Sequence, residues 1–381
     1  MKKVHITLVG SETLPAYYPI KMLMPDEVHI IGSNQTKEQV KRIQSVLKSE
    51  GTTSSALFVD DAYDVEATCK IFEGIHEQLE EDGIVSCNLT GGTKVMALAA
   101  YKMCTLYGWE VLYTDSKKLI NFDSLQKDDL VCDITNKTIF RLQGQRLRRY
   151  DVLETRNEAR YEAALKVREF IENYKSCYKA LQNYKKSLAK GNDFPPYLPL
   201  DNVKGEYRFD GKKMTITKNG EEVLCLERED AYALLMEGRW WEAIVADVLY
   251  RWSNRRYEIW QNVEFEPVGT NAPNAAEDIK NEVDILVRVD ATFVFVECKS
   301  GDVTQDNLYK LDAVRRTYGS NKSEAILISY APFNMRQHLP EKAREKSIIT
   351  RYYNKKEFTF NEFCNDLGSW MHRITTGQNL H

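Results

Sequence analysis

The stretch "NEVDILVRVDATFVFVECKSGD" (residues 281–302) contains two strongly apolar runs. Asp284 lies in the first run, and Glu297 and Lys299 follow the second. Successive side chains of a strand point to opposite faces, so Glu297 and Lys299 project from the same side. The run "ATFVFV" before them is too apolar for an exposed edge strand. If the preceding strand pairs with it through a turn at residues 290–291, Asp284 lies close to Glu297. The stretch therefore predicts two paired, buried strands with two carboxylates and an ammonium at one end.

Two carboxylates beside an ammonium suit the hydrolysis of a phosphodiester with a divalent metal. Asp284 and Glu297 would supply hard oxygen ligands to Mg²⁺ or Mn²⁺, and the backbone carbonyl of Cys298 would add another. Lys299 would orient the nucleophile or stabilise the transition state. Glu242, in "GRWWEAIVADVLY", lies beside a buried helical stripe and is a further candidate ligand. The alternative is a surface ion pair at the end of a strand.

Three further residues lie near these candidates in the chain. Gln305 is either a phosphate contact or a polar group at a helix start. Asp247 and Glu282 are expected to be surface charges. The six histidines show no H-x-x-x-H or H-x-H grouping, which disfavours a histidine-based hydrolase.

A second informative stretch is "CNLTGGTKVMALAAYKM" (residues 87–103), in which a strand is expected to end at Thr90 and a helix to begin at Thr93 and Lys94. Backbone N–H groups at a helix start form an anion site when glycines allow close approach and a lysine adds charge. The stretch is neither a G-x-x-x-x-G-K-[ST] loop nor a G-x-G-x-x-G motif. The alternative is a plain strand-to-helix turn.

Polar residues also follow the first two predicted strands, "VHITLVG" and "EVHIIG". The carboxyl ends of parallel strands meet at one edge of a sheet, and ligands bind there. The predicted ligand site therefore comprises Ser11, Glu12, Thr13, Gly32, Ser33, Thr90, Gly91, Gly92, Thr93 and Lys94.

The size and composition of the chain limit the kinds of protein that it can be. A chain of 381 residues and 44.1 kDa is too long for one hydrophobic core, so two folded domains are expected. No run approaches the roughly 20 apolar residues that span a bilayer, so no membrane insertion is expected. Eight cysteines without a C-x-x-C pair favour reduced thiols and a cytoplasmic location. The net charge of −4 gives no global attraction to nucleic acid.

The order of the segments predicts an α/β protein with three parts. Residues 1–149 alternate short apolar runs with helical patterns, which is typical of a Rossmann-like domain with a parallel sheet. Residues 150–228 begin with a polar, helix-favouring segment and continue around Asp-Gly and Asn-Gly turn signals. A helical connector and a small β-hairpin element are expected there. Residues 229–381 form a second α/β domain.

This second domain resembles the PD-(D/E)xK nuclease superfamily. A helix with a glutamate is followed by a strand with an aspartate and then by "ECK" as the E-x-K motif. The resemblance covers residues 229–335, and Val283 stands where the name of the family has proline. It implies a restriction-endonuclease-like fold and an endonuclease that uses Mg²⁺ or Mn²⁺.

With "LTGGTK" upstream, the chain resembles the CRISPR-associated Rossmann-fold (CARF) effectors that fuse a sensor to such a nuclease. That family implies a homodimer whose two sensor domains bind a cyclic oligoadenylate, a messenger of type III CRISPR antiviral defence. A cyclic tetra-adenylate matches two-fold symmetry, each half meeting Thr93 and Lys94 of one protomer. The implied activity is messenger-activated cleavage of single-stranded RNA, DNA or both.

Two other functions remain open. The chain is alternatively a nucleotide-sensing regulator whose nuclease-like domain only binds nucleic acid, and the presence of Asp284, Glu297 and Lys299 together disfavours this. It is alternatively a stand-alone restriction or repair nuclease with an unrelated Rossmann domain, which "LTGGTK" disfavours.

Overall fold

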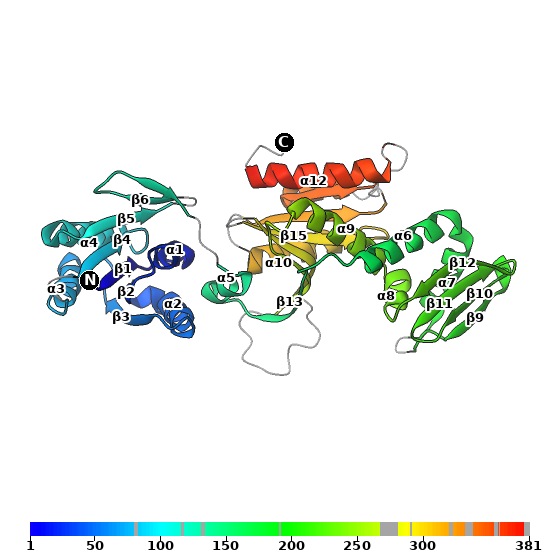
Figure 1. Cartoon of the computed structure of the whole chain (residues 1–381), viewed down its shortest axis with the longest axis horizontal. Coiled ribbons are helices and arrows are strands. Elements are labelled where there is room, and N and C mark those ends of the chain that lie inside the picture. Colours follow the sequence, from blue (N-terminus) through cyan, green and yellow to red (C-terminus); the bar gives the residue numbers. More distant parts are fainter. Residues whose placement is uncertain are drawn as a thin grey trace. The chain divides into compact units, whose positions relative to one another are not determined.

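The chain divides into two compact units, Met1–Leu147 and Arg148–His381. Figure 1 shows them in a computed structural model, the first unit in blue to cyan and the second in green to red. The structure describes residues 1–79, 83–115, 118–130, 134–189, 192–266, 281–289, 292–319, 323–331, 338–353, 357 and 359–376. Within these ranges every helix is too short or too polar to cross a lipid bilayer.

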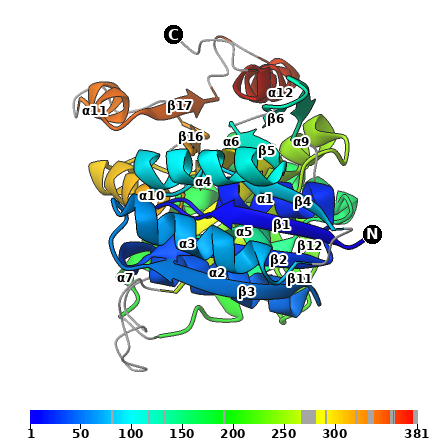
Figure 2. The same cartoon turned by 90° about the vertical axis from the view of Figure 1, so that its left-hand side faces the viewer.

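A seven-stranded sheet of order β3-β2-β1-β4-β5-β6-β7 is central to the first unit. Its strands are β1 (Lys3–Leu8), β2 (Glu27–Ser33), β3 (Thr53–Val59), β4 (Ile84–Asn88), β5 (Glu110–Thr114), β6 (Lys118–Asn121) and β7 (Lys127–Asp129). Strands β1 to β5 pair in parallel, which confirms the predicted Rossmann-like sheet. Figure 2 shows β3, β2, β1 and β4 side by side in this order. The strand order reverses between β1 and β4, the point where open parallel sheets bind ligands.

Helices cover both faces of this sheet. They are α1 (Leu14–Leu23), α2 (Lys37–Ser49), α3 (Val65–His76), α4 (Lys94–Tyr107) and α5 (Asn136–Gln143), with a 3₁₀ turn η1 (Asn34–Thr36). One face is apolar, because Phe72 of α3 and Met96 of α4 share a core with Ile6 of β1. The other face is partly polar, since the Thr7 hydroxyl donates to the Ala16 carbonyl at 3.2 Å.

The turns that follow β1 and β4 lie in backbone contact, and Gly91 makes this contact possible. A Cβ on Gly91 would lie 2.0 Å from the Leu8 carbonyl oxygen and 2.8 Å from the Gly10 nitrogen. Gly92 has a φ of +72°, a conformation that glycine adopts without steric cost. The glycine pair of "LTGGTK" therefore fixes one ligand-edge turn against the other.

The second unit contains two sheets. The first sheet has four strands: β9 (Tyr197–Leu200), β10 (Gly205–Phe209), β11 (Lys213–Lys218) and β12 (Glu221–Glu227). The second sheet has six strands: β8 (Leu147–Val152), β13 (Ile259–Phe265), β14 (Asn281–Val289), β15 (Thr292–Lys299), β16 (Glu324–Ser329) and β17 (Ile348–Tyr352). Their orders are β12-β11-β10-β9 and β17-β16-β15-β14-β13-β8. The predicted small hairpin element is therefore part of a four-stranded sheet. Its extra strand β9 was missed because it contains Pro199, which only an edge strand tolerates.

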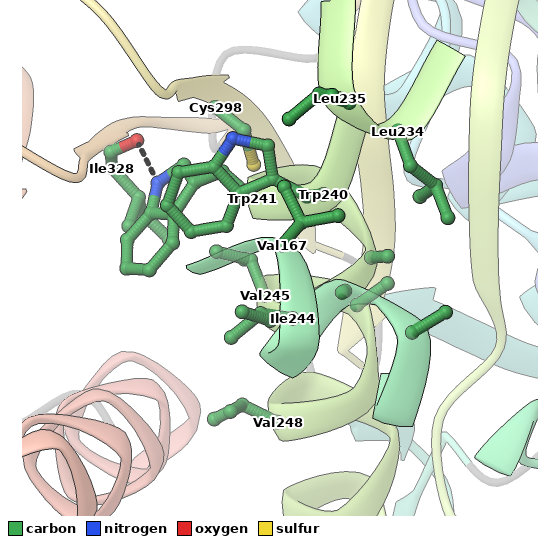
Figure 3. Close-up of a cluster of buried hydrophobic side chains, with 14 of the residues drawn as sticks. Val167, Leu234, Leu235, Trp240, Trp241, Ile244, Val245, Val248, Cys298 and Ile328 are labelled. Atoms are coloured by element: carbon green, nitrogen blue, oxygen red, sulfur yellow. Dashed lines mark hydrogen bonds between the residues drawn. The ribbon is translucent and has the colours of Figure 1, made fainter. Parts of the chain in front are cut away.

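The helices of the second unit are α6 (Glu158–Asn173), α7 (Lys175–Ser187), α8 (Ala231–Met236), α9 (Arg239–Ser253), α10 (Gln305–Tyr318), α11 (Leu339–Glu345) and α12 (Phe360–Thr376), with a 3₁₀ turn η2 (Asp201–Val203). Figure 3 shows that Trp240 and Trp241 of α9 pack with Val167 of α6 and Cys298 of β15. The Trp241 indole N–H donates to the Ile328 carbonyl at 3.0 Å. Helix α9 is thus fixed on the sheet, and connector helix α6 shares its core.

The Gly91 contact predicts opposite effects for two glycine substitutions. Gly91→Ala should lower the free energy of unfolding by about 1–3 kcal/mol, because the added methyl collides with backbone that cannot turn away. Gly74→Ala, inside α3 with open space around its Cβ position, should raise it by roughly 0.5–1 kcal/mol. Calorimetric unfolding of the full chain measures both. A Gly91→Ala chain as stable as the original would mean that the two turns are not in contact.

Candidate functional site

Asp284, inside β14, and Glu297, near the end of β15, lie side by side on the paired strands. The antiparallel register places them one step beyond the last recorded pair of the two strands. The backbone N–H of Cys298 donates to Asp284 Oδ2 at 2.6 Å, which holds the aspartate against the end of β15. The two acids that the sequence predicted to be neighbours are therefore brought together. The turn predicted at residues 290–291 lies outside the described residues.

Glu297 and Lys299 form an ion pair of 2.5 Å between Oε1 and Nζ. Only 3% of Glu297 is exposed, so this is not an ion pair on the surface. Burial disfavours the charged ammonium, but Glu297 and Asp284 outweigh burial and raise the pKa of Lys299 above its ordinary value. Lys299 therefore stays protonated at neutral pH.

The surroundings of the two other acids, Asp284 and Glu242, disfavour their charged forms. The pKa of Asp284 is raised well above its ordinary value, first by burial and then by the charges of Glu297 and Glu242. Burial likewise raises the pKa of Glu242, although nearby arginines and Lys299 oppose it. Buried Glu297 and the partly buried Asp284 and Glu242 thus all interact electrostatically with Lys299. A divalent cation would neutralise this excess of negative charge.

The donor atoms fit a hard cation, although they do not form a closed cage. Among the described residues, no group of three or more His, Cys, Asp or Glu side chains is arranged to hold a metal. Glu297 instead directs an oxygen toward Lys299. The neighbouring donors are carboxylate oxygens, which Mg²⁺ and Mn²⁺ prefer. The Cys298 thiol lies in the hydrophobic core and is not one of these donors. The backbone carbonyl of Cys298 stays a predicted ligand.

Glu242 stands in the first turn of α9, next to the end of β15. Gly238, just before the helix, has a φ of +84°, and a Cβ there would lie 2.3 Å from the Ser300 hydroxyl oxygen. This close approach brings the start of α9 against the residue that follows Lys299. Glycine at position 238 therefore positions Glu242, and the sequence prediction did not consider it.

The three remaining residues near the site differ in their surroundings. Gln305 begins α10, is partly exposed, and donates its amide N–H to the Tyr309 hydroxyl. Glu282 is half-buried. The prediction that Asp247 is a surface charge is wrong: it is 6% exposed. Because α6 packs along this side of α9, Asp247 is buried and pairs with Arg156 and Arg251 at 2.6 and 2.8 Å.

The predicted ligand residues of the first unit all lie at the carboxyl ends of β1, β2 and β4: Gly32 and Ser33 end β2, Lys94 begins α4, and the others lie in the turns. Several of these side chains form hydrogen bonds within the folded unit. The Thr93 hydroxyl caps α4 and donates to the Ala62 carbonyl at 2.6 Å. The Thr13 hydroxyl is buried and donates to the Leu142 carbonyl at 3.0 Å, and Thr90 bonds to Asn88.

Two more of them are structural. Ser33 is buried and caps η1. A Cβ on Gly32 would lie 2.6 Å from a Val40 methyl group, so this glycine allows α2 to pack closely. The members that face solvent are Ser11, Glu12, Gly92 and Lys94. These four are therefore the members of the predicted ligand site that are accessible from solvent.

Asn88 organises this edge, and the sequence prediction missed it. Its side chain is fully buried at the end of β4. Its amide donates to the Pro15 carbonyl at 2.9 Å, and its oxygen accepts from the Thr90 hydroxyl at 2.6 Å. One side chain thereby connects the first turn of α1 with the glycine turn. The signal in the sequence is an asparagine that ends the apolar run "GIVSCN".

Known proteins match both units. Residues 4–139 match the family described as Card1 CARF domain, and residues 229–349 match the Card1-like endonuclease domain. No match was found among curated proteins.

Several solved structures share the fold over most of the chain. Can2 from Sulfobacillus thermosulfidooxidans, in complex with cyclic tetra-adenylate, is 17% identical with a TM-score of 0.66 and covers 98% of this chain and 96% of its own. Protein VC1899 from Vibrio cholerae is 16% identical with a TM-score of 0.70 and 98% coverage of both chains. A type III CRISPR defence DNA nuclease activated by cyclic oligoadenylate is 15% identical, with a TM-score of 0.58, and covers 88% of this chain and 46% of its own.

The two family matches lie in separate units of the structure, in the order that the sequence resemblance predicted. The likeness to the solved structures extends this agreement to the fold of nearly the whole chain. The chain therefore combines a Card1-type CARF domain with a Card1-like endonuclease domain.

Proposed function

We propose that the chain is a divalent-metal-dependent endonuclease that a cyclic oligoadenylate activates in the cytoplasm, as part of type III CRISPR defence. The observation that carries the catalytic part is the cluster of buried Glu297 with partly buried Asp284 and Lys299 inside the matched endonuclease domain. The activating part is supported by the matched CARF domain and by two structural neighbours described with such ligands.

Asp284, Glu297 and Glu242 would hold Mg²⁺ or Mn²⁺, with the Cys298 carbonyl as a further ligand. When bound there, such a metal would supply a water of lowered pKa and polarise the scissile phosphate. The carboxylates come from β14, β15 and α9, whose backbones are fixed in one core, so side-chain rotation, including release of Glu297 from Lys299, would bring them onto a cation. Lys299 stays charged and donates hydrogen bonds to the attacking water or to a phosphate oxygen. The substrate is single-stranded RNA, DNA or both.

Cleavage of labelled RNA and DNA with Mn²⁺, with and without each cyclic oligoadenylate, tests this function. Glu297→Gln should lose activity and bind Mn²⁺ about ten- to a hundredfold more weakly, because a ligand oxygen is replaced. Lys299→Met should lose roughly a hundred- to a thousandfold in rate while Mn²⁺ affinity persists, because an ammonium is not a ligand.

Lys166→Met, on the exposed side of α6, is the matched control and should keep full activity. If Glu297→Gln and Lys299→Met both cleave like the original chain, the buried ion pair is structural and the nuclease proposal is wrong. Cleavage that ignores every cyclic oligoadenylate would remove only the activating part of the proposal.

The raised pKa of Asp284 predicts that the charge of this carboxylate destabilises the metal-free protein, and that a bound cation removes this cost. The pKa in the folded state lies above the value near 3.9 in unfolded chains. The metal-free protein therefore loses stability as the pH rises through the folded-state pKa. Asp284→Asn removes this charge and still accepts the hydrogen bond from Cys298.

In EDTA, Asp284→Asn should unfold at a higher temperature than the original chain, by roughly 2–4 °C for each kcal/mol gained, and the gap should widen as the pH rises. Added Mn²⁺ should raise the unfolding temperature of the original chain much more than that of the variant. Thermal scans at several pH values measure both effects. A variant that is less stable than the original chain in EDTA at pH 8 would contradict the electrostatic account.

The ligand is proposed to bind at the carboxyl edge of the first sheet through Lys94 and the start of α4. Lys94→Ala should weaken the binding of cyclic tetra-adenylate roughly ten- to a hundredfold, the loss of one charge-assisted phosphate contact. Lys102→Ala removes an exposed lysine from the same helix away from its start and should leave affinity unchanged. Calorimetry that finds equal affinities for both variants would move the ligand site elsewhere.

The functional unit is proposed to be a homodimer formed through α4. Leu98 and Tyr101 are 69% and 46% exposed, and both follow Lys94 along one face of the helix. A two-fold axis at this apolar stripe would place both copies of Lys94 against one two-fold symmetric ligand. Exposed apolar stripes of this kind are typical of interaction surfaces.

Light scattering should therefore give about twice the chain mass of 44.1 kDa without ligand. Leu98→Glu should give the monomer mass, because a charge buried in an apolar interface is costly. Met24→Glu, at another exposed apolar residue, should remain dimeric. A dimer that survives Leu98→Glu would place the interface on another surface.

A further inference from the structure

A groove between α9 and α12 carries side chains of a single charge sign. Its volume is about 740 Å³, and it lies toward the end of α9 that is remote from Glu242. Among the described residues that line it, two are arginines, one is a histidine and one is a tryptophan, and none is an aspartate or a glutamate. The lining residues are Val248, Arg251, Trp252, Cys364, Asn365, Gly368, Ser369, His372 and Arg373.

An aromatic side chain is fixed in the wall of this groove. A Cβ on Gly368 of α12 would lie 3.5 Å from the Trp252 ring, so the two helices are in contact there. The Trp252 ring also stacks on the Tyr257 ring, with centroids 5.2 Å apart. In Figure 3, Val248 points from α9 toward the pale red helix α12. Trp252 remains partly exposed, so a flat group in the groove could stack on it.

Three arginines gather at this end of α9. Arg251, in its last turn, pairs with Asp247 at 2.8 Å, yet its side chain is 47% exposed. This arginine already supplies the positive charge that a helix end favours. Arg255 and Arg256 follow the helix and are exposed, and Arg255 donates to the neutral Tyr250 hydroxyl at 3.3 Å. Neither of these two arginines is ion-paired within the described part of the chain, so two positive charges are left uncompensated here.

We propose that this groove, together with the two arginines that follow α9, binds the backbone of a single-stranded nucleic acid. The inference rests on the proposed function and adds a place where the substrate strand is held away from the metal site. Arginine binds phosphates through charge and paired hydrogen bonds, and an exposed aromatic ring stacks on a base of any kind. Because the chain has a net charge of −4, such binding requires a local basic surface.

The helix sets the separation between the groove and the metal site. Arg251 follows Glu242 by nine residues, which is about 14 Å along the axis of α9. This is the height of about four stacked nucleotides at roughly 3.4 Å each. A strand in the groove is therefore held at least that far from the phosphate that is cleaved, so the groove acts on affinity and not on the chemical step.

The direct test is the affinity of the full chain for labelled single-stranded RNA and DNA of about 20 nucleotides, measured in EDTA so that nothing is cleaved. Arg255→Gln combined with Arg256→Gln should weaken binding roughly ten- to a hundredfold at low salt. Each phosphate contact on a single strand contributes about 0.7 to the slope of log affinity against log salt. The loss of two contacts should therefore reduce this slope by about 1.4.

A second pair of variants changes the lining of the groove itself. Ser369→Glu, at an exposed position of α12, adds a carboxylate that repels phosphates and should weaken binding severalfold, whereas Ser369→Ala should bind like the original chain. The control for charge is Arg148→Gln combined with Arg149→Gln, an exposed arginine pair of β8, which should keep both affinity and slope.

Cleavage with Mn²⁺ separates this inference from the proposed function. The groove variants should cleave with KM raised roughly tenfold and kcat changed less than about twofold. Unchanged affinity in the Arg255 and Arg256 variant and in Ser369→Glu would overturn the inference, even if the chain cleaves nucleic acid. An equal loss of affinity in the Arg148 and Arg149 control would also overturn it, since net charge would then explain the effect. If the groove variants lose affinity but the original chain cleaves nothing, the nuclease proposal fails and the groove stands.

Discussion

The excess of buried negative charge at the end of β15 is the constraint on which the account of the second unit depends. Asp284, Glu297 and Glu242 interact with one another and with Lys299, and Arg239 and Arg160 also act on Glu242. Folding alone gives no reason to bury such a cluster, because each unpaired charge costs free energy. The tryptophans of α9 and the apolar strands supply the stability that holds the acids in place. A site that is unfavourable without a cation and fixed by its surroundings is suited to metal chemistry.

Both candidate sites also depend on glycines that let two segments of backbone meet. Gly91 lets the turn after β4 rest against the end of β1, and Gly238 lets α9 start against Ser300. In each case the chemistry-bearing residue, Lys94 or Glu242, follows within one turn of a helix. The glycines thus place the two helix starts that carry these candidate residues, and in the first unit Asn88 reinforces the same arrangement.

Local sequence pattern was enough for the parallel sheet, for the paired strands β14 and β15, and for the acids at their ends. These features follow from apolar periodicity and from side-chain alternation, which are properties of short segments. Burial of Asp247 could not be predicted, because α6, which covers it, lies far away in the sequence. The internal bonds of Thr13 and Thr93 were missed for the same reason: their partners Leu142 and Ala62 are remote in the chain.

Anomalous X-ray diffraction from crystals soaked in Mn²⁺ tests the central claim most directly, because it locates the cation without relying on activity. The account predicts an anomalous peak within coordinating distance of the Asp284 and Glu297 carboxylates, with the Lys299 ammonium displaced from its position against Glu297. The same soak of Asp284→Asn should give no peak there. Manganese bound elsewhere in the endonuclease domain, with these carboxylates unliganded and the ion pair intact, would contradict the account.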